Sequence, residues 1–207
     1  MRFRSAPRRE MKRCASFVLA GWLCLLAPVG QAQDAPGAVD PLGLVRDPGA
    51  RIIHVVAPTF AQYKLDLDAG WGKTEILEGD FSRTVYLAPS GQSNLAAFRY
   101  YQKALVSVGF KKQLEIDGAS TIDSYFFDQY FFGPETYNPS DPSSLYNLVN
   151  NALHPYYSIY KGTWHGKSVT VVLLTGLAKA MEYREPGVDA TVGDGQVFAA
   201  IDLISPQ

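Results

Sequence analysis

The first 32 residues determine which part of the chain has to fold by itself. Six Lys and Arg and one Glu lie within residues 1–13, and an apolar run follows over residues 14–29. A basic stretch, an apolar stretch of this length and small residues before the cleaved bond are typical of a Sec signal peptide, with cleavage between Ala32 and Gln33. The run is shorter than the roughly 20 apolar residues of a membrane-spanning helix. We therefore expect an exported protein that begins at Gln33, resides in the periplasm and has no membrane span.

Removal of this leader also removes both cysteines, Cys14 and Cys24. No small-residue lipobox precedes Cys24, so we expect no lipid anchor. The remaining 175 residues have no disulfide, no thiol nucleophile and no cysteine-ligated metal. A chain of that length buries enough surface to be stable as one domain on its core alone. Met1 and Met11 both stay open as start codons, because the basic residues after Met11 are sufficient for a signal peptide.

Export also changes the charge of the protein. The full chain has a net charge of −1, but the expected mature chain holds 13 Lys and Arg against 19 Asp and Glu, a net charge of −6. An acidic domain is repelled by nucleic acids and by anionic lipid surfaces. We therefore expect neither as a partner.

Periodicity in the mature chain predicts a sheet-rich domain after a loose leader. Residues 33–50 contain three Pro and three Gly, which indicates a flexible leader. Beyond it, alternating or β-branched runs indicate strands, and residues 177–195 are expected to be a connector. The predicted strands cover residues 51–58, 61–67, 82–89, 110–117, 156–164, 167–176 and 196–204, with a two-residue hairpin turn at His165 and Gly166.

Two segments have helical spacing. The first covers residues 94–108, with Ser93 as the N-cap and Gly109 in the left-handed position that ends a helix. The second, shorter helix is predicted for residues 144–153. Because strands and helices are largely segregated along the chain, residues 51–207 are expected to form a single α+β domain. In that domain, an antiparallel sheet has one main helix and a second shorter helix packed on one face.

Four segments together resemble a known family. They are Y-x-L at residues 63–65, G-x-x-x-x-x-x-Y-x-x-P-x-G at 79–91, F-x-x-Y-x-x-A-L-x-x-x-G-F at 98–110 and V-F-x-x-I-D-L-I at 197–204. In these segments the chain resembles a family of unknown function from Gram-negative envelope proteins, often found in front of an OmpA-like peptidoglycan-binding domain. The resemblance implies an α+β fold and an envelope location. It supplies no catalytic residues.

Two departures from that family limit what the resemblance implies. The chain ends at Gln207 without an OmpA-like domain, so peptidoglycan anchoring is not expected here. Many family members also have a cysteine pair after the strand that follows the main helix, whereas this chain has aromatic residues there.

The spacing of reactive residues does not match familiar catalytic or metal sites. The three histidines, His54, His154 and His165, are scattered and lack the i, i+4 spacing of a helical zinc site. Residues 91–95 begin like a nucleophile elbow but lack its final glycine, and the glycines of residues 193–195 precede a strand and no helix. We therefore expect no metal and no cofactor.

Aromatic density is the unusual feature of the mature chain. Between residues 125 and 160, 11 of 36 residues are Tyr or Phe. Two interpretations stay open: extra core in place of a cysteine pair, or a binding surface, since Tyr combines contact area with a polar tip. Tyr is expected to be more exposed than Phe. The candidate binding residues are Tyr125, Tyr130, Tyr156, Tyr157, Tyr160 and Trp164.

These observations favour a non-enzymatic accessory or binding module of the periplasm, which binds an envelope protein or a glycan through its aromatic surface. The alternative is a hydrolase of an envelope polymer that uses paired carboxylates among Asp66, Asp80 and Asp128, because a glycosidase needs two carboxyl groups in one cleft. A third hypothesis is a structural subunit or a carrier of an apolar molecule.

Overall fold

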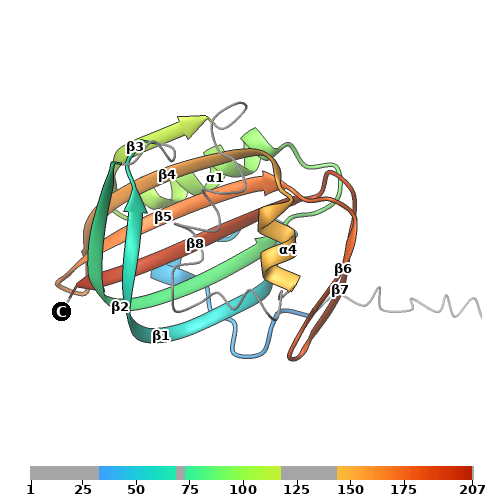
Figure 1. The fold of residues 1–207 in the computed structure, drawn as a ribbon, viewed down its shortest axis with the longest axis horizontal. Coiled ribbons are helices and arrows are strands. Elements are labelled where there is room, and N and C mark those ends of the chain that lie inside the picture. The colour runs from blue at the N-terminus through green and yellow to red at the C-terminus, as the bar shows by residue number, and fades with distance from the viewer. Residues whose placement is uncertain (1–32, 69–72, 118–143, 207) are drawn as a thin grey trace, which may run out of the picture. The chain divides into compact units, whose positions relative to one another are not determined.

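The computed structural model describes residues 33–68, 73–117 and 144–206. They form a six-stranded antiparallel sheet in the order β1-β2-β8-β5-β4-β3 and a separate two-stranded sheet of β6 and β7 (Figure 1). The class is α+β, with strands predominant. The strands are β1 (Arg51–Asp66), β2 (Thr74–Leu87), β3 (Lys111–Asp117), β4 (Leu153–Trp164), β5 (Lys167–Leu177), β6 (Met181–Glu185), β7 (Val188–Val192) and β8 (Val197–Pro206); the helices are α1 (Asn94–Ser107), α4 (Ser144–Asn150) and the 3-10 turn η1 (Pro41–Gly43).

Strand β1 joins the two strands expected at residues 51–58 and 61–67. It pairs with β2 along its length, and its register shifts between Ile52 and His54 and again between Val56 and Thr59. Pro58 lies at the second shift. A proline there breaks no ladder, because β1 is an edge strand and one side of it needs no partner. The predicted break between two strands is therefore an irregularity within one long strand.

The sheet curls strongly. Strands β1 and β4 are separated by three strands in the sheet order, yet the Tyr157 hydroxyl of β4 donates to the Asp66 carbonyl of β1 over 3.3 Å. Next to it, Lys161 of β4 pairs with Glu75 at the start of β2, 3.1 Å away. The end of the β1–β2 hairpin therefore crosses one face of the sheet and reaches β4 (Figure 1).

Helices α1 and α4 lie on opposite faces of the sheet (Figure 1). On one face, Phe98 of α1 stacks on Tyr156 with ring centroids 5.0 Å apart. On the other, the side chain of Ala152, just after α4, lies beside Phe198 against the open position of Gly176. The prediction that both helices pack on one face is wrong. The reason is that residues 169–176 of β5 are all buried, and a strand apolar on both faces needs cover on both.

Residues 33–50 pack against the domain, so the prediction of a loose leader before a domain starting at residue 51 is also wrong. The Ala35 amide donates to the Ile52 carbonyl over 2.8 Å, and the Ile52 amide donates to the Asp34 carboxylate at the same distance. Leu42 and Leu44 are buried in the main core. The leader prediction relied on its prolines and glycines, which mark turns and do not report whether those turns are packed.

Several local predictions are confirmed. The Ser93 side chain accepts a hydrogen bond from the Ala96 amide at the start of α1, and Gly109 after α1 has a φ of +95°. His165 and Gly166 form the hairpin turn between β4 and β5, with φ of 49° and 79°. Positive φ at both residues is the signature of a primed turn, which matches the twist of the two strands. The connector expected at residues 177–195 instead contains strands β6 and β7.

A buried ion pair joins the neighbouring strands β2 and β8. Arg83 and Asp202 are direct cross-strand partners, and their side chains are 1% and 0% exposed. The guanidinium donates to both carboxylate oxygens, over 2.6 and 2.7 Å, and the Tyr63 hydroxyl donates to Asp202 over 2.9 Å. Burial lowers the pKa of Arg83, but the charge and hydrogen bonds of Asp202 outweigh this, so the pKa is raised. Arg83 therefore keeps its positive charge in the folded protein near neutral pH.

Removing one partner of this ion pair should lower the free energy of unfolding more than removing both partners. Asp202→Ala leaves the Arg83 charge buried without its counter-ion, and we expect a loss of about 3–5 kcal/mol in the free energy of unfolding. The double variant Arg83→Met, Asp202→Leu replaces the pair by apolar groups and should recover much of that loss. Urea denaturation followed by circular dichroism measures both. A double variant less stable than Asp202→Ala would contradict this expectation.

His54 on β1 should make the protein sensitive to mild acid. Burial, aided by the positive charge of Arg83, lowers the pKa of His54 to about 4. Between the ordinary pKa of about 6.5 and that value, the unfolded chain takes up a proton that the folded chain does not. Stability therefore falls as the pH falls from 6.5 to 4. We expect His54→Gln to reduce this fall, measured as the urea midpoint at pH 7, 5.5 and 4.5; parallel pH profiles would contradict it.

Candidate binding site along helix α1

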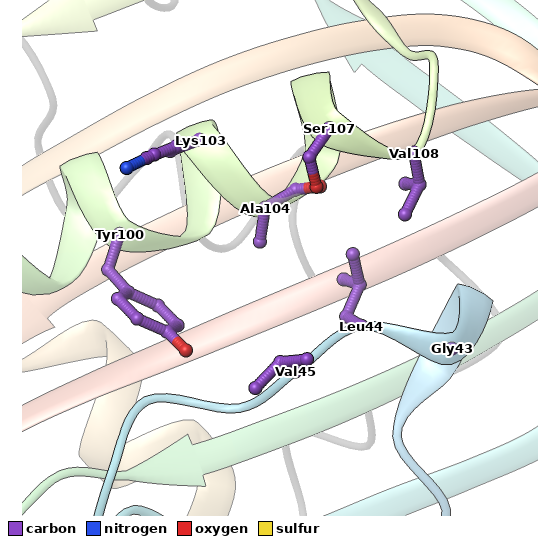
Figure 2. A pocket seen from close by; sticks show the side chains of 8 residues that line it. All are labelled: Gly43, Leu44, Val45, Tyr100, Lys103, Ala104, Ser107 and Val108. Atoms are coloured by element: carbon purple, nitrogen blue, oxygen red, sulfur yellow. The ribbon is translucent and has the colours of Figure 1, made fainter.

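The outer side of α1 borders an apolar groove of about 300 Å³ (Figure 2). One wall is formed by Gly43, the last residue of η1, and by the side chains of Leu44 and Val45; the other wall belongs to α1. Val45 is 73% exposed and lies beside the other apolar side chains of the groove. The groove-lining residues are Gly43, Leu44, Val45, Tyr100, Lys103, Ala104, Ser107 and Val108.

Charged contacts hold the first wall of this groove in place. The Arg46 guanidinium pairs with Asp34 over 2.7 Å and with Asp40 over 3.0 Å, which ties both ends of the segment together. Helix α1 adds a link, because the Tyr100 hydroxyl donates to the Arg46 carbonyl over 3.0 Å. The hydroxyl of Tyr86 donates to Asp40 over 2.9 Å and fixes the segment to the sheet. The groove is thus a built feature of the fold.

A second hollow, of about 260 Å³, lies on the other side of α1. It is basic: Arg99 and Lys103 of α1 and Lys112 of β3 line it, together with Gln102, Val106 and Tyr160. We call it the basic pocket. Lys103 lines both hollows, and among the described residues it takes part in no ion pair.

One carboxylate faces the cations of the basic pocket. Glu115 of β3 accepts from Arg99 over 2.7 Å, from Gln102 over 3.1 Å and from Lys112. Burial raises the pKa of Glu115, but its hydrogen bonds with Lys112, Gln102 and Arg99 outweigh this and hold the pKa at about 2. Glu115 is therefore ionised at neutral pH, and three cations face one anion.

Tyr160 brings a buried hydroxyl to this pocket. The residue is 0% exposed, and within the described part of the chain its hydroxyl makes no hydrogen bond. Burial raises the pKa of Tyr160, while the nearby Ser158 and Gln102 side chains lower it; the net shift is upward. The hydroxyl therefore keeps its proton at neutral pH, and it is a buried donor without an acceptor among the described residues.

The charge of this surface is opposite to that of the whole domain. Residues 94–114, which cover α1 and the first part of β3, contain four basic and no acidic residues. The expected mature chain as a whole carries a net charge of −6. A local excess of positive charge on an acidic protein attracts anionic groups to one place.

Of the six aromatic residues proposed from the sequence, the structure describes four, and two of these lie in the core. Tyr157 and Tyr160 are 2% and 0% exposed, so the expectation that the tyrosines are the exposed members of this segment is wrong for them. Tyr156 is partly buried under Phe98, and Trp164 is partly buried beside His165. Tyr125 and Tyr130 lie outside the described residues.

The carboxylates proposed for hydrolysis do not meet in either hollow. Asp66 is buried at the end of β1, where it accepts from the Asp68 amide over 2.8 Å, and Asp80 is half-buried on β2. Asp128 lies outside the described residues. Across the described ranges, no group of three His, Cys, Asp or Glu residues is placed to hold a metal ion. Neither described helix is long and apolar enough to cross a bilayer.

Comparison with known proteins does not assign the chain to a family. No protein-family model matches it, and no curated protein matches it either. The resemblance to the module of OmpA-like envelope proteins therefore stays a proposal.

The periodicity of α1 placed Arg99 and Lys103 on its outer side but did not mark them as a site. A usable signal was present, namely the absence of acidic residues from 94–114 in an otherwise acidic chain. The apolar wall at residues 43–45 had no such signal, because it lies in a segment interpreted as a loose leader.

Loss of the Arg46 contacts should loosen the wall of the groove. In Arg46→Gln, the pairs with Asp34 and Asp40 are lost, at a cost of about 1.4 kcal/mol, or a factor of ten in local opening. Hydrogen exchange at the Ala35 and Leu44 amides should accelerate by about tenfold. Arg184→Gln is the matched control, because the Arg184–Asp189 pair is exposed and 4.0 Å long. Equal exchange in both variants would contradict the role given to Arg46.

Proposed function

We propose that this chain is an exported, non-enzymatic binding module of the cell envelope, which holds a partner protein along helix α1. The leader at residues 1–32 and the resemblance to an envelope module support the periplasm as its location. The observation that carries the binding function is the pair of hollows on the two sides of α1, one apolar and one basic, with Lys103 between them.

Protein is the favoured partner because of the mixed chemistry of this surface. Interfaces combine an apolar centre with charged groups at its rim, and open hollows accept side chains that project from another chain. A glycan would need exposed aromatic platforms, but among the candidates that the structure describes, Tyr157 and Tyr160 are buried and the other two are partly buried. The hydrolase alternative has less support, because Asp66 and Asp80 line neither hollow.

Site-specific photo-crosslinking in living cells tests this function. The full chain, with its own leader, is produced in a Gram-negative host with a photoreactive residue in place of Val106 or Val45, one beside each hollow. Ile76 on β2 is the matched control, since it is aliphatic and 59% exposed against 57% for Val106. We expect the same crosslinked partner band from Val106 and from Val45, and no band from Ile76. The measured mass of the exported protein should correspond to a chain that starts at Gln33. Equal products at all three positions would overturn the proposal.

A further inference from the structure

The basic pocket has more hydrogen-bond donors for carboxylates than it has carboxylates: three cations face the single carboxylate of Glu115. Arg99, Lys112 and Gln102 already bind one such group, that of Glu115, so their spacing is demonstrably compatible with it. Charge-assisted hydrogen bonds of this kind are the stronger ones in proteins. After Glu115 is counted, Lys103 and the Tyr160 hydroxyl have no anionic partner among the described residues.

We propose that the basic pocket binds the carboxylate of an acidic side chain from a partner polypeptide, with Lys103 and the Tyr160 hydroxyl as the donors that Glu115 leaves unused. The same partner segment places an aliphatic side chain in the groove beside Leu44 and Val45. This inference rests on the proposed function and specifies the chemistry of the partner: a segment that carries acidic and aliphatic residues close together.

Charge complementarity supports this occupant. Residues 94–114 carry four positive charges and no negative one, so an acidic segment is attracted and a basic one repelled. The groove is lined by aliphatic groups, with Ala104 and Val108 facing Leu44 and Val45 across it (Figure 2). Aliphatic side chains spaced along a segment are the usual anchors in such a groove.

The shape of the site favours a polypeptide over a membrane surface. A protein that lies on lipid inserts protruding Trp, Phe or Leu side chains below the headgroups. Here both features are hollows, and the exposed apolar side chains at their edges are Val45 and Val106. The net charge of −6 on the expected mature chain would also be repelled by anionic lipid as a whole.

Fluorescence anisotropy with a designed peptide tests the proposal on the exported protein. The probe is a labelled, end-capped hexapeptide, Leu-Glu-Ala-Leu-Glu-Leu, and its matched control has Gln in place of both Glu residues. We expect the acidic probe to bind at least tenfold more tightly than the control, with an affinity that falls as salt is added. No binding at millimolar probe, or equal binding of the two peptides, overturns the proposal.

Single-group variants separate a binding role from a structural one. Tyr160→Phe removes only the hydroxyl and should weaken the acidic probe about tenfold, with Lys103→Gln similar. Glu115→Gln removes the competing carboxylate and should strengthen binding severalfold, whereas a purely structural Glu115 would weaken it when lost. Lys73→Gln, on the β1–β2 hairpin, is the control cation and should change nothing. Circular dichroism confirms that each variant is folded; unchanged affinity in folded Tyr160→Phe and Glu115→Gln counts against the site.

Two further arms identify other outcomes. In the first, the protein sediments with phosphatidylglycerol vesicles and binds no peptide, and Lys103→Gln abolishes the sedimentation. That result would identify an anionic lipid, and no polypeptide, as the ligand of the basic pocket. If the crosslink from Val106 persists while the acidic probe fails to bind, the proposed binding function stands, and the inference that the partner segment is acidic is wrong. If both fail, the proposed function falls as well.

Discussion

The ion pair between Arg83 and Asp202 is the contact on which the arrangement of the sheet depends. It joins β2 to β8, so it links the β1–β2 hairpin to the part of the sheet against which α1 packs. Both charges are almost fully buried, and each is compensated only when the register is correct. A slip of one residue would move Asp202 to the opposite face and leave Arg83 buried without it. With no cysteine in residues 33–207, this pair adds a specific polar link to a largely apolar core.

Cover on both faces of the sheet follows from its apolar central strands. Residues 169–176 of β5 are buried throughout, so neither face of this strand can be left to solvent. On the α1 face the cover is shared with residues 33–50, fixed through Arg46 and its two carboxylates. This shared cover creates the groove, because two separate segments meet there above one sheet. The proposed binding surface is thus a consequence of how the core is closed.

Local structure was predictable wherever it depends on neighbouring residues. The Ser93 cap, the glycine after α1 and the His165–Gly166 turn follow from backbone preferences that act over a few residues, and all three are confirmed. The placement of α4 and of residues 33–50 was not, because it depends on which apolar surface remains uncovered after the strands pair. The aromatic segment shows the same limit: a tyrosine spacing is equally consistent with core and with surface, and the strand pairing put Tyr157 and Tyr160 inside.

The sequence by itself determined that residues 33–207 are acidic and free of cysteine, that their main elements are strands with one capped helix, and that residues 94–114 contain four basic and no acidic residues. These properties belong to residues taken singly or in short runs. Tertiary structure alone decided that Lys103 lies between an apolar groove and a basic pocket, and that Glu115 and Tyr160 meet Arg99 there. Residues from α1, β3, β4 and the segment before β1 come together only when the sheet curls and both its faces are covered, and that depends on the whole chain.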